Sequence, residues 1–381
     1  MKTSRERILT THVGSLPRTD AVAEALLRKE KHEAYDSAEF ETTIHDGVAA
    51  VVLRQQAIGI DIVSDGEMSK IAYSTYIQDR LSGFGGDNQR KISADLVDYP
   101  DFRQKMARMA GTQPFRRASC IGPVAVLDTK PLERDIANFR DALAGARVTE
   151  AFMNAASPGL VTAFQPNEYY PSHEAYVRAL AEPMRAEYEA IVGAGFILQL
   201  DCPDLAMARH TTFQDLSEDA FIKQAALHVD VLNDAVRNIP ADKMRMHICW
   251  GNYEGPHDHD IALEKVIGIV LRAKPAAILF EAANPRHEHE WIVWRDAKIP
   301  DDKILVPGLL DTSTNYVEHP ELIAQRIATF AGIVGRERVI AGTDCGFGTF
   351  AGYGKMDPEI SYKKLGALVE GAKLASQRLW K

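Results

Sequence analysis

The chain has 381 residues, of which 46% are hydrophobic and 25% are charged, and its formal net charge is −9 at pH 7. This composition is that of a globular protein in water, and the acidic balance argues against a protein that tracks nucleic-acid phosphates. The opening segment Met1–Asp20 lacks the apolar stretch of a secretion signal, and no apolar run approaches the roughly 20 residues that cross a bilayer. We therefore expect no nucleic acid partner, no membrane and a cytoplasmic location.

β-rich segments alternate with longer amphipathic segments along the chain. The predicted strands are Ile8–Val13, Ile60–Ser64, Ala118–Leu127, Leu160–Phe164, Phe196–Asp201, Met244–Cys249, Ala277–Glu281, Ile304–Gly308 and Arg338–Gly342. The predicted helices include His173–Val192, Glu218–Val236, Ile261–Ala273, Glu318–Val334 and Ser361–Leu379. Such alternation predicts parallel strands joined by right-handed crossovers.

We expect an α/β fold, a (β/α)8 TIM barrel that forms a single domain over residues 1–381. The predicted strands exceed the eight of a barrel by one, and Leu160–Phe164 is the weakest of them. Residues 82–115 are expected to form an excursion or inserted lobe, because Ser82–Asp101 is rich in Gly, Asp and Asn. A doubly wound open sheet is the alternative, although no Gly-rich nucleotide fingerprint follows any strand.

Chemically reactive side chains stand where the later strands end. One predicted strand ends in His247-Ile248-Cys249, and residues two apart on a strand point to the same side. The next strand ends in Glu281, and the last is followed by Cys345. The carboxyl ends of barrel strands surround a single mouth. Two thiolates, an imidazole and a carboxylate suit a tetrahedral zinc ion, whereas each cysteine alone is equally a small core residue.

This His-x-Cys, Glu, Cys pattern resembles the zinc set of the catalytic domain of cobalamin-independent methionine synthase, a family in one superfamily with uroporphyrinogen decarboxylase. The resemblance implies a Zn2+ held by His247, Cys249, Glu281 and Cys345. It also implies a small thiol substrate and an alkyl donor. In such a site the metal turns the thiol into a thiolate, which few free thiols with a pKa near 8.5 are at neutral pH.

Shorter motifs extend the resemblance toward the start of the chain. Thr11–Arg18 resembles the family's opening strand and loop, which contact an amino-acid thiol. Glu67, in Asp65-Gly66-Glu67, and Asp201, in Leu198–Asp201, resemble the carboxylates that bind the substrate amino group. The resemblance therefore implies that the substrate-binding residues are Val13, Ser15, Glu67 and Asp201.

Two departures from the family concern the methyl donor. No aromatic residue stands between Val124 and Asp128, where the folate-using enzymes have one beneath the pterin. The family's Asp-x-His, which protonates the leaving folate, reads Asp311-Thr312-Ser313 here. We therefore expect Asp311 and Ser313 as the catalytic pair and a donor other than folate. A methylated corrinoid or corrinoid protein, an epoxide and a methyl sulfonium remain open.

Two alternative functions follow from related families. The epoxyalkane:coenzyme M transferase branch resembles the chain in length and zinc motif, and its sulfonate substrate would need a cation such as Arg18 or Arg286. For the epoxide, Ser313, Tyr316 or His12 are candidate proton donors. A decarboxylase of the uroporphyrinogen type would need several arginines and no metal. Retention of the Glu67 and Asp201 carboxylates favours the amino-acid thiol homocysteine.

Four other histidines of the second half, His257, His259, His287 and His289, are expected to have no chemical role. His257 and His259 stand in a His-Asp-His-Asp run that resembles a metal cluster, but the run is predicted to be a solvated loop, with Asp260 as the N-cap of the next helix. His287 and His289 are assigned in the same way, because they stand among charged residues.

Overall fold

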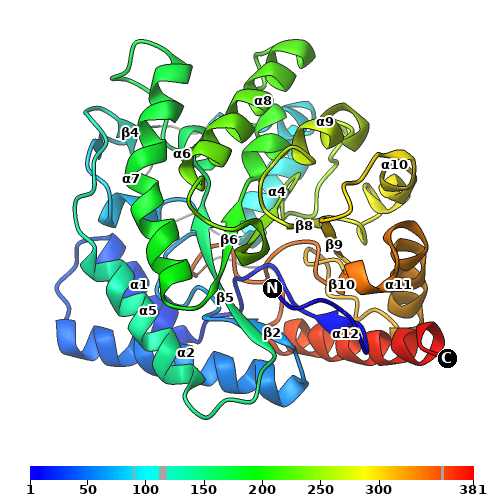
Figure 1. Cartoon of the computed structure of the whole chain (residues 1–381). Helices are drawn as coiled ribbons and strands as arrows, with labels where there is room; N and C mark the ends of the chain where they lie inside the picture. Colours follow the sequence, from blue (N-terminus) through cyan, green and yellow to red (C-terminus); the bar gives the residue numbers. More distant parts are fainter. Residues whose placement is uncertain (89–90, 111–117, 353–355) are drawn as a thin grey trace.

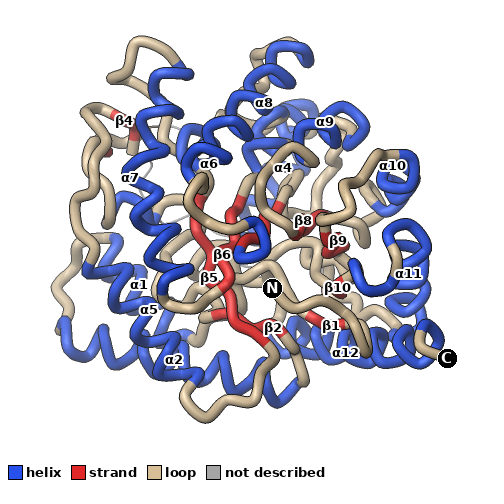
Figure 2. Tube along the Cα trace, viewed as in Figure 1, coloured by secondary structure: helices blue, strands red, loops and turns tan. Residues whose placement is uncertain are grey.

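The computed structural model describes residues 1–88, 91–110, 118–352 and 356–381. The strands of its main sheet lie in the centre and its helices surround them (Figures 1 and 2). Six strands form a continuous, curved parallel sheet in the order β2-β5-β6-β7-β8-β9. These strands are β2 (Ile62–Ser64), β5 (Glu150–Ala156), β6 (Ile197–Asp201), β7 (Met244–His247), β8 (Ala277–Phe280) and β9 (Ile304–Pro307).

Two short strands, β1 (Leu9–Thr10) and β10 (Ile340–Ala341), pair in parallel and stand between the two ends of this sheet. On one side, isolated parallel bridges join Leu305 to Val339 and Gly308 to Gly342. On the other side, the Asp61 amide donates to the Thr10 carbonyl over 3.2 Å. The α/β class and the curved parallel sheet are therefore confirmed, and closure into a complete eight-stranded barrel stays a prediction.

The helices follow the strands in alternation, as the sequence predicted. They are α1 (Asp20–Glu30), α2 (Ser37–Ile58), α3 (Ala94–Asp98), α4 (Pro100–Ala110), α5 (Lys130–Leu143), α6 (Pro158–Phe164), α7 (His173–Gly193), α8 (Glu218–Ala235), α9 (Leu263–Val270), α10 (Trp291–Asp296), α11 (Pro320–Val334) and α12 (Pro358–Leu379). All five of the predicted helices named above correspond to one of these. Within the described ranges, none of the helices is long and apolar enough to cross a membrane.

The apolar residues form two clusters that follow the period of the strands. The inner cluster consists of residues from the strands and Val13, and Ile197 of β6 belongs to it. Leu198 and Leu200, its neighbours on the same strand, belong to the outer cluster between sheet and helices. Successive side chains on a strand point to opposite faces, so Gln199 and Asp201 follow Ile197 on the inner face.

Two strand predictions were wrong. Leu160–Phe164 lies in helix α6, which begins after Ser157, whose side chain accepts a hydrogen bond from the Leu160 amide. The strand at this position in the order is β5, which the sequence analysis missed. Of Ala118–Leu127, only Ser119–Cys120 forms a strand, β4, which pairs antiparallel with β3 (Phe84–Gly85) outside the main sheet.

The segment 82–115 contains β3, α3 and α4, while residues 89–90 and 111–115 of it lie outside the described residues. Its treatment as an inserted lobe of a single domain stays a prediction.

Candidate metal and substrate site

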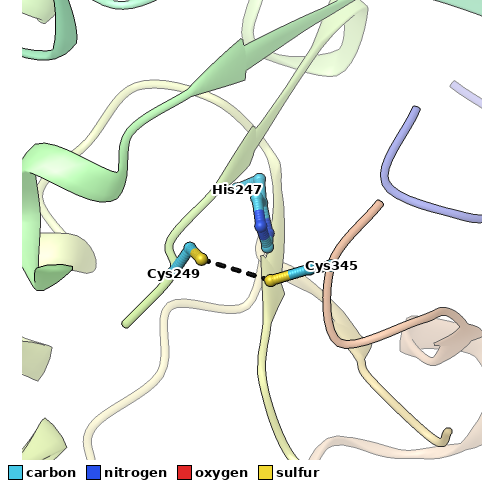
Figure 3. Close-up of side chains that lie close together, drawn as sticks. All are labelled: His247, Cys249 and Cys345. Atoms are coloured by element: carbon cyan, nitrogen blue, oxygen red, sulfur yellow. Dashed lines mark hydrogen bonds between the residues drawn. The ribbon is translucent and has the colours of Figure 1, made fainter. Parts of the chain in front are cut away.

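Three of the four predicted zinc ligands converge at the carboxyl ends of the strands. His247 ends β7, Cys249 follows two residues later, and Cys345 follows β10. One ligand atom from each lies within 4.8 Å of the other two, and all three residues are buried. The two sulfurs are 3.2 Å apart, and the imidazole is directed toward them (Figure 3).

The protonation of this cluster suits a cation. Burial lowers the pKa of His247 to about 3, so the ring is neutral, and its Nδ1 is buried without a hydrogen-bond partner. The pKa of Cys345 is raised well above its usual value, first by the hydrogen bond with Cys249 and then by burial. A neutral imidazole next to two thiols that need positive charge to ionise is a donor set that zinc prefers.

Glu281, the fourth predicted ligand, stands beside this cluster. Its Oε1 is 3.8 Å from the Cys345 sulfur and accepts a hydrogen bond of 2.7 Å from the Trp250 amide. Its Oε2 accepts a hydrogen bond of 2.7 Å from the Asn284 side chain. Both oxygens are therefore held by protein donors at the edge of the site, and the assignment of Glu281 as a ligand stays a prediction.

Asp344 links the two loops that present Cys345 and Glu281. Its Oδ1 accepts from the amides of Ala282 and Ala283, each over 2.9 Å, and its Oδ2 accepts from the Asn284 amide over 2.9 Å. A single buried carboxylate thus fixes the turn after β8 to the residue that precedes Cys345. The sequence analysis did not single out Asp344, although this residue directly precedes the predicted ligand Cys345.

A cavity of about 350 Å³ opens onto the cluster. All four residues predicted to bind substrate line it, as do the three clustered ligands: Val13, Ser15, Glu67, Asp201, His247, Cys249 and Cys345. The metal and substrate residues predicted from separate motifs therefore face one space.

The two acidic residues of the described cavity wall are buried, and their pKa values are raised. Burial raises the pKa of Glu67 to about 7 and that of Asp201 to about 6. Asp201 accepts hydrogen bonds from the side chains of Asn154 and Gln199, whereas Glu67 Oε2 is buried without any partner. A ligand that brings a positive charge or N–H donors to this place would satisfy that oxygen.

Arg18 does not face the cavity as an anion-binding residue would. Its guanidinium donates to the backbone carbonyls of Glu67 and Lys70, each over 2.8 Å, and to that of Gly348. It therefore holds the loop that presents Glu67. Arg286, the other cation named for a sulfonate, is exposed and is not part of the described cavity wall.

The predicted catalytic pair lies apart from the described wall of the cavity. Ser313 donates its hydroxyl to Asp311 Oδ1 over 2.7 Å, and neither residue lines the cavity. The residue between them, Thr312, donates to the side chain of Asn252, which does line it. A catalytic role for Asp311 and Ser313 stays a prediction. Of the other proton donors named for an epoxide, Tyr316 is 83% exposed and His12 is fully buried against Gln55.

Sequence reasoning missed two parts of this region. The α3–α4 segment forms part of the cavity wall through Leu96, Arg103 and Met106, and aromatic side chains of Tyr73, Phe164 and Phe350 line it as well. None of these residues belongs to a motif with a fixed spacing. Their convergence depends on the tertiary fold.

The predictions for the remaining histidines were wrong in part. His257 and His287 are buried around Asp260, which accepts hydrogen bonds from both instead of capping a helix. The residue that precedes α9 is Ala262, which provides no side-chain cap. His259 and His289 are exposed, as predicted.

Comparisons with known proteins agree with the resemblance seen in the motifs. The family described as the catalytic domain of cobalamin-independent synthase matches residues 8–97. A methionine synthase from Saccharolobus solfataricus is 25% identical over 376 residues, which cover 97% of this chain and 95% of that protein. A methionine synthase from Sulfurisphaera tokodaii is 23% identical over 372 residues, covering 97% and 93%.

Among solved structures, a B12-independent methionine synthase from Shewanella sp. W3-18-1 in complex with selenomethionine is similar in fold. The TM-score is 0.75 at 21% identity, and the match covers 98% of this chain and 99% of that one. The similarity to cobalamin-independent methionine synthases that the motifs indicated is thereby confirmed. It extends beyond the family match at the start of the chain to the half that contains Cys249 and Cys345.

Proposed function

We propose that this chain is a zinc-dependent S-methyltransferase that methylates the sulfur of homocysteine, with a donor other than folate. The observation that supports this most directly is the buried cluster of His247, Cys249 and Cys345 on the same cavity as Glu67 and Asp201. We also infer that residues 1–381 form a single barrel domain with 82–115 as an inserted lobe, whose helices α3 and α4 form part of the cavity wall.

The residues present fit zinc. His247, Cys249 and Cys345 would hold the ion, and Glu281 is the ligand that substrate sulfur would replace, because its oxygens already have protein donors. Zinc bound there would lower the pKa of a substrate thiol and keep its sulfur in place. The protein's own contribution is to hold these three side chains buried against the cavity that would receive the substrate.

Glu67 and Asp201 would bind the substrate amino group. An ammonium between them would give Glu67 Oε2 the donor it lacks and would offset the repulsion between the two buried carboxylates. The relative from Shewanella binds selenomethionine, the selenium analogue of methylated homocysteine, which supports an amino-acid thiol.

In the reaction, the thiolate sulfur attacks the methyl carbon in line with the bond to the donor. The new S–C bond forms as the donor–carbon bond breaks, and its electron pair leaves with the donor. The aromatic wall of Tyr73, Phe164 and Phe350 is the place for that donor. A folate donor is disfavoured because Ser313 replaces the histidine that would protonate it. The Shewanella relative is named a B12-independent enzyme, and this name gives no support to a corrinoid donor.

The alternatives have less support. Coenzyme M carries a sulfonate, and the pair of carboxylates next to the thiol cluster would repel it. Arg103 and Lys91 line the cavity, but Lys91 pairs with Asp215. A decarboxylase for a polycarboxylate would need several arginines, and Arg103 is the sole arginine in the described cavity wall.

Thiol binding to the zinc-loaded chain, measured by calorimetry, tests this function. We expect homocysteine to bind more tightly than 4-mercaptobutyrate, which lacks the amino group, and more tightly than coenzyme M. E67Q should weaken homocysteine binding by about 10- to 100-fold, because a hydrogen bond to a charged group contributes about 1.5–3 kcal/mol.

The same variant should leave the affinity for 4-mercaptobutyrate within about twofold, since that ligand has no ammonium to lose. The exposed Glu168 provides the matched control, E168Q, which should bind all three thiols as the wild type does. Tighter binding of coenzyme M than of homocysteine, together with no effect of E67Q, would contradict the proposal.

A further inference from the structure

A second group of ionisable side chains, separate from the thiol cluster, lies around His287, which packs against the Trp250 ring. It comprises His210, which follows the 3-10 turn Met207–Arg209, His257 and Asp260 in the loop between β7 and α9, and His287 after β8. The side chains of His210, Asp260 and His287 are at most 2% exposed, and that of His257 is 10% exposed. The proposed methyl transfer gives no role to any of them.

Every ring nitrogen of His257 and His287 faces an acceptor. Asp260 Oδ2 lies 2.9 Å from His257 Nδ1 and 3.0 Å from His287 Nε2. The second nitrogen of His287 lies 2.9 Å from Glu290 Oε2, and that of His257 lies 3.0 Å from the Tyr253 carbonyl oxygen. A neutral imidazole has one N–H, so these four contacts are hydrogen bonds only if both rings are doubly protonated.

A divalent cation could replace the two additional protons on His257 and His287, because the total charge of the group stays the same. Two imidazolium rings balance the carboxylates of Asp260 and Glu290, and a single divalent cation with two neutral rings gives the same total. In that state each histidine would ligate with the nitrogen that faces Asp260. Its other N–H would donate to Glu290 or to the Tyr253 carbonyl, and metal-bound histidines have such partners almost without exception.

His210 is an independent sign of a missing ligand. Its side chain is 1% exposed, and its Nδ1 lies 3.1 Å from Asp260 Oδ1. Nevertheless, neither ring nitrogen of His210 nor Asp260 Oδ1 has a hydrogen-bond partner of acceptable geometry. The buried His210 imidazole therefore has the Asp260 carboxylate beside it as an ion-pair contact but no well-aligned hydrogen bond, and a buried polar group without a good hydrogen bond costs free energy.

We propose that His257, Asp260 and His287 form a second divalent-cation site, separate from the thiol cluster, with His210 as its fourth ligand. Ligand atoms of His257, Asp260 and His287 lie within 4.8 Å of one another, whereas His210 is outside that set and reaches it through its 3.1 Å contact with Asp260. A tetrahedral zinc ion with bonds of about 2.1 Å has its ligands about 3.4 Å apart, so the side chains need only small shifts. Imidazole and carboxylate ligands without sulfur select ions such as Zn2+ or Co2+ rather than Ca2+.

A cation here would fix the wall of the substrate cavity. His210 and Tyr253 line that cavity, and the ligands come from three separate loops. The Trp250 ring packs against His287 with centroids 4.4 Å apart, while the Trp250 amide donates to Glu281. The ion would therefore act through position and take no part in the chemistry.

Zinc binding to the full-length C249S/C345S variant, measured by equilibrium dialysis with metal analysis, tests the proposal. We expect this variant to retain about one zinc ion per chain. Adding H287N should weaken that binding by at least about tenfold, because it removes one ligand of the site. Adding H259N, which changes an exposed histidine paired with Asp98, is the matched control and should leave binding unchanged.

A folded C249S/C345S variant that binds no zinc, or zinc binding that H287N leaves unchanged, would overturn the proposal. If the double variant does not fold, the wild-type chain and H257N give the same decision. About two zinc ions per wild-type chain, falling to about one in H257N, support a second site. About one zinc ion in both proteins refutes it. Failure of the thiol-binding experiment would leave this result unaffected, because the two sites share no ligand.

Discussion

Glu67 has a φ of 58° and follows Gly66, whose φ is 65°. A side chain in this left-handed region costs free energy, and such residues persist where neighbouring groups hold them. The Glu67 amide donates to Asp65 Oδ1, and its carbonyl accepts from Arg18. The loop therefore imposes a conformation that brings a carboxylate into the cavity.

Burial of the Glu67 carboxylate makes E67Q a stabilising change at high pH. Its pKa in the folded state is raised to about 7, above the ordinary value of 4.5. The stability linked to its protonation is thus fully present below about pH 4.5 and is lost as the pH rises through about 7. At pH 8 we expect E67Q to exceed the wild type in free energy of unfolding by about 1–3 kcal/mol.

Urea unfolding of both proteins at pH 8 and pH 4.5 measures this difference. The advantage of E67Q should shrink or vanish at pH 4.5, where the wild-type carboxyl is protonated. A variant less stable than the wild type at pH 8 would show that the charged form of Glu67 is stabilised by its neighbours.

At the scale of the elements, the alternation of the strands explains why the site could be found from the sequence. Arg245 and His247 take alternate positions of β7 and point inward, and Arg245 bonds to Gln199 on the inner face of β6. Cys249 continues this period just past the strand. The spacing of His247 and Cys249, with parallel pairing of β7 and β8, is enough to predict one shared mouth.

The wrong strand predictions arose where a short apolar segment was assigned without regard to the residues on either side of it. Ser157-Pro158 is an N-cap followed by proline at the first helical position, and it marks Leu160–Phe164 as helical despite its apolar residues. β5 was missed because Glu150–Ala156 contains three alanines and no β-branched residue. Sheet pairing with β2 and β6 determines its conformation.

Only part of the histidine cluster could be recognised from the sequence, as the His-Asp-His-Asp run 257–260, because His210 and His287 come from distant loops. Asp260 and His287 are in contact although they are separated by an entire strand and helix. Their charged neighbours in sequence, such as Glu288 and His289, are exposed and give the segment a solvated appearance.

Asp344 links the loop that presents Cys345 to the loop that presents Glu281, and this link leads to a prediction for D344N. An amide at this position cannot keep both of its terminal atoms as acceptors for the amides of Ala282, Ala283 and Asn284. We expect zinc affinity of the thiol cluster to fall by about 10- to 100-fold, as for other groups that orient ligands. Competition with a chromophoric chelator measures this affinity.

The exposed Asp296 provides the control, D296N, which should bind zinc as the wild type does. Unchanged affinity in D344N would mean that the loop after β8 does not depend on Asp344.

At the scale of the whole molecule, the fold does not depend on the metal for its core. The outer cluster contains residues from Ile8 to Ala375 and lies between the helices and the sheet. The inner cluster covers the inner face of the curved sheet. A chain with such a core differs from small zinc domains, which unfold when the metal is removed.

Chelation should therefore leave the fold intact. We expect an unchanged far-UV circular dichroism spectrum at 25 °C and a Tm lower by about 4–5 °C, since binding at 100 to 1,000 times Kd stabilises by about 3–4 kcal/mol. Loss of secondary structure on chelation would instead indicate a structural zinc site and count against exchange of Glu281 for substrate.

The central claim is that homocysteine sulfur joins the two cysteine sulfurs on one metal ion. The most direct measurement is the sulfur-to-cobalt charge-transfer absorption of the Co2+-substituted chain, to which a site of histidine and carboxylate ligands does not contribute. We expect such a band before substrate is added, and a rise of about half on saturation with homocysteine as two thiolates become three. Absence of the band, or a band that saturating homocysteine does not change, would contradict the central claim.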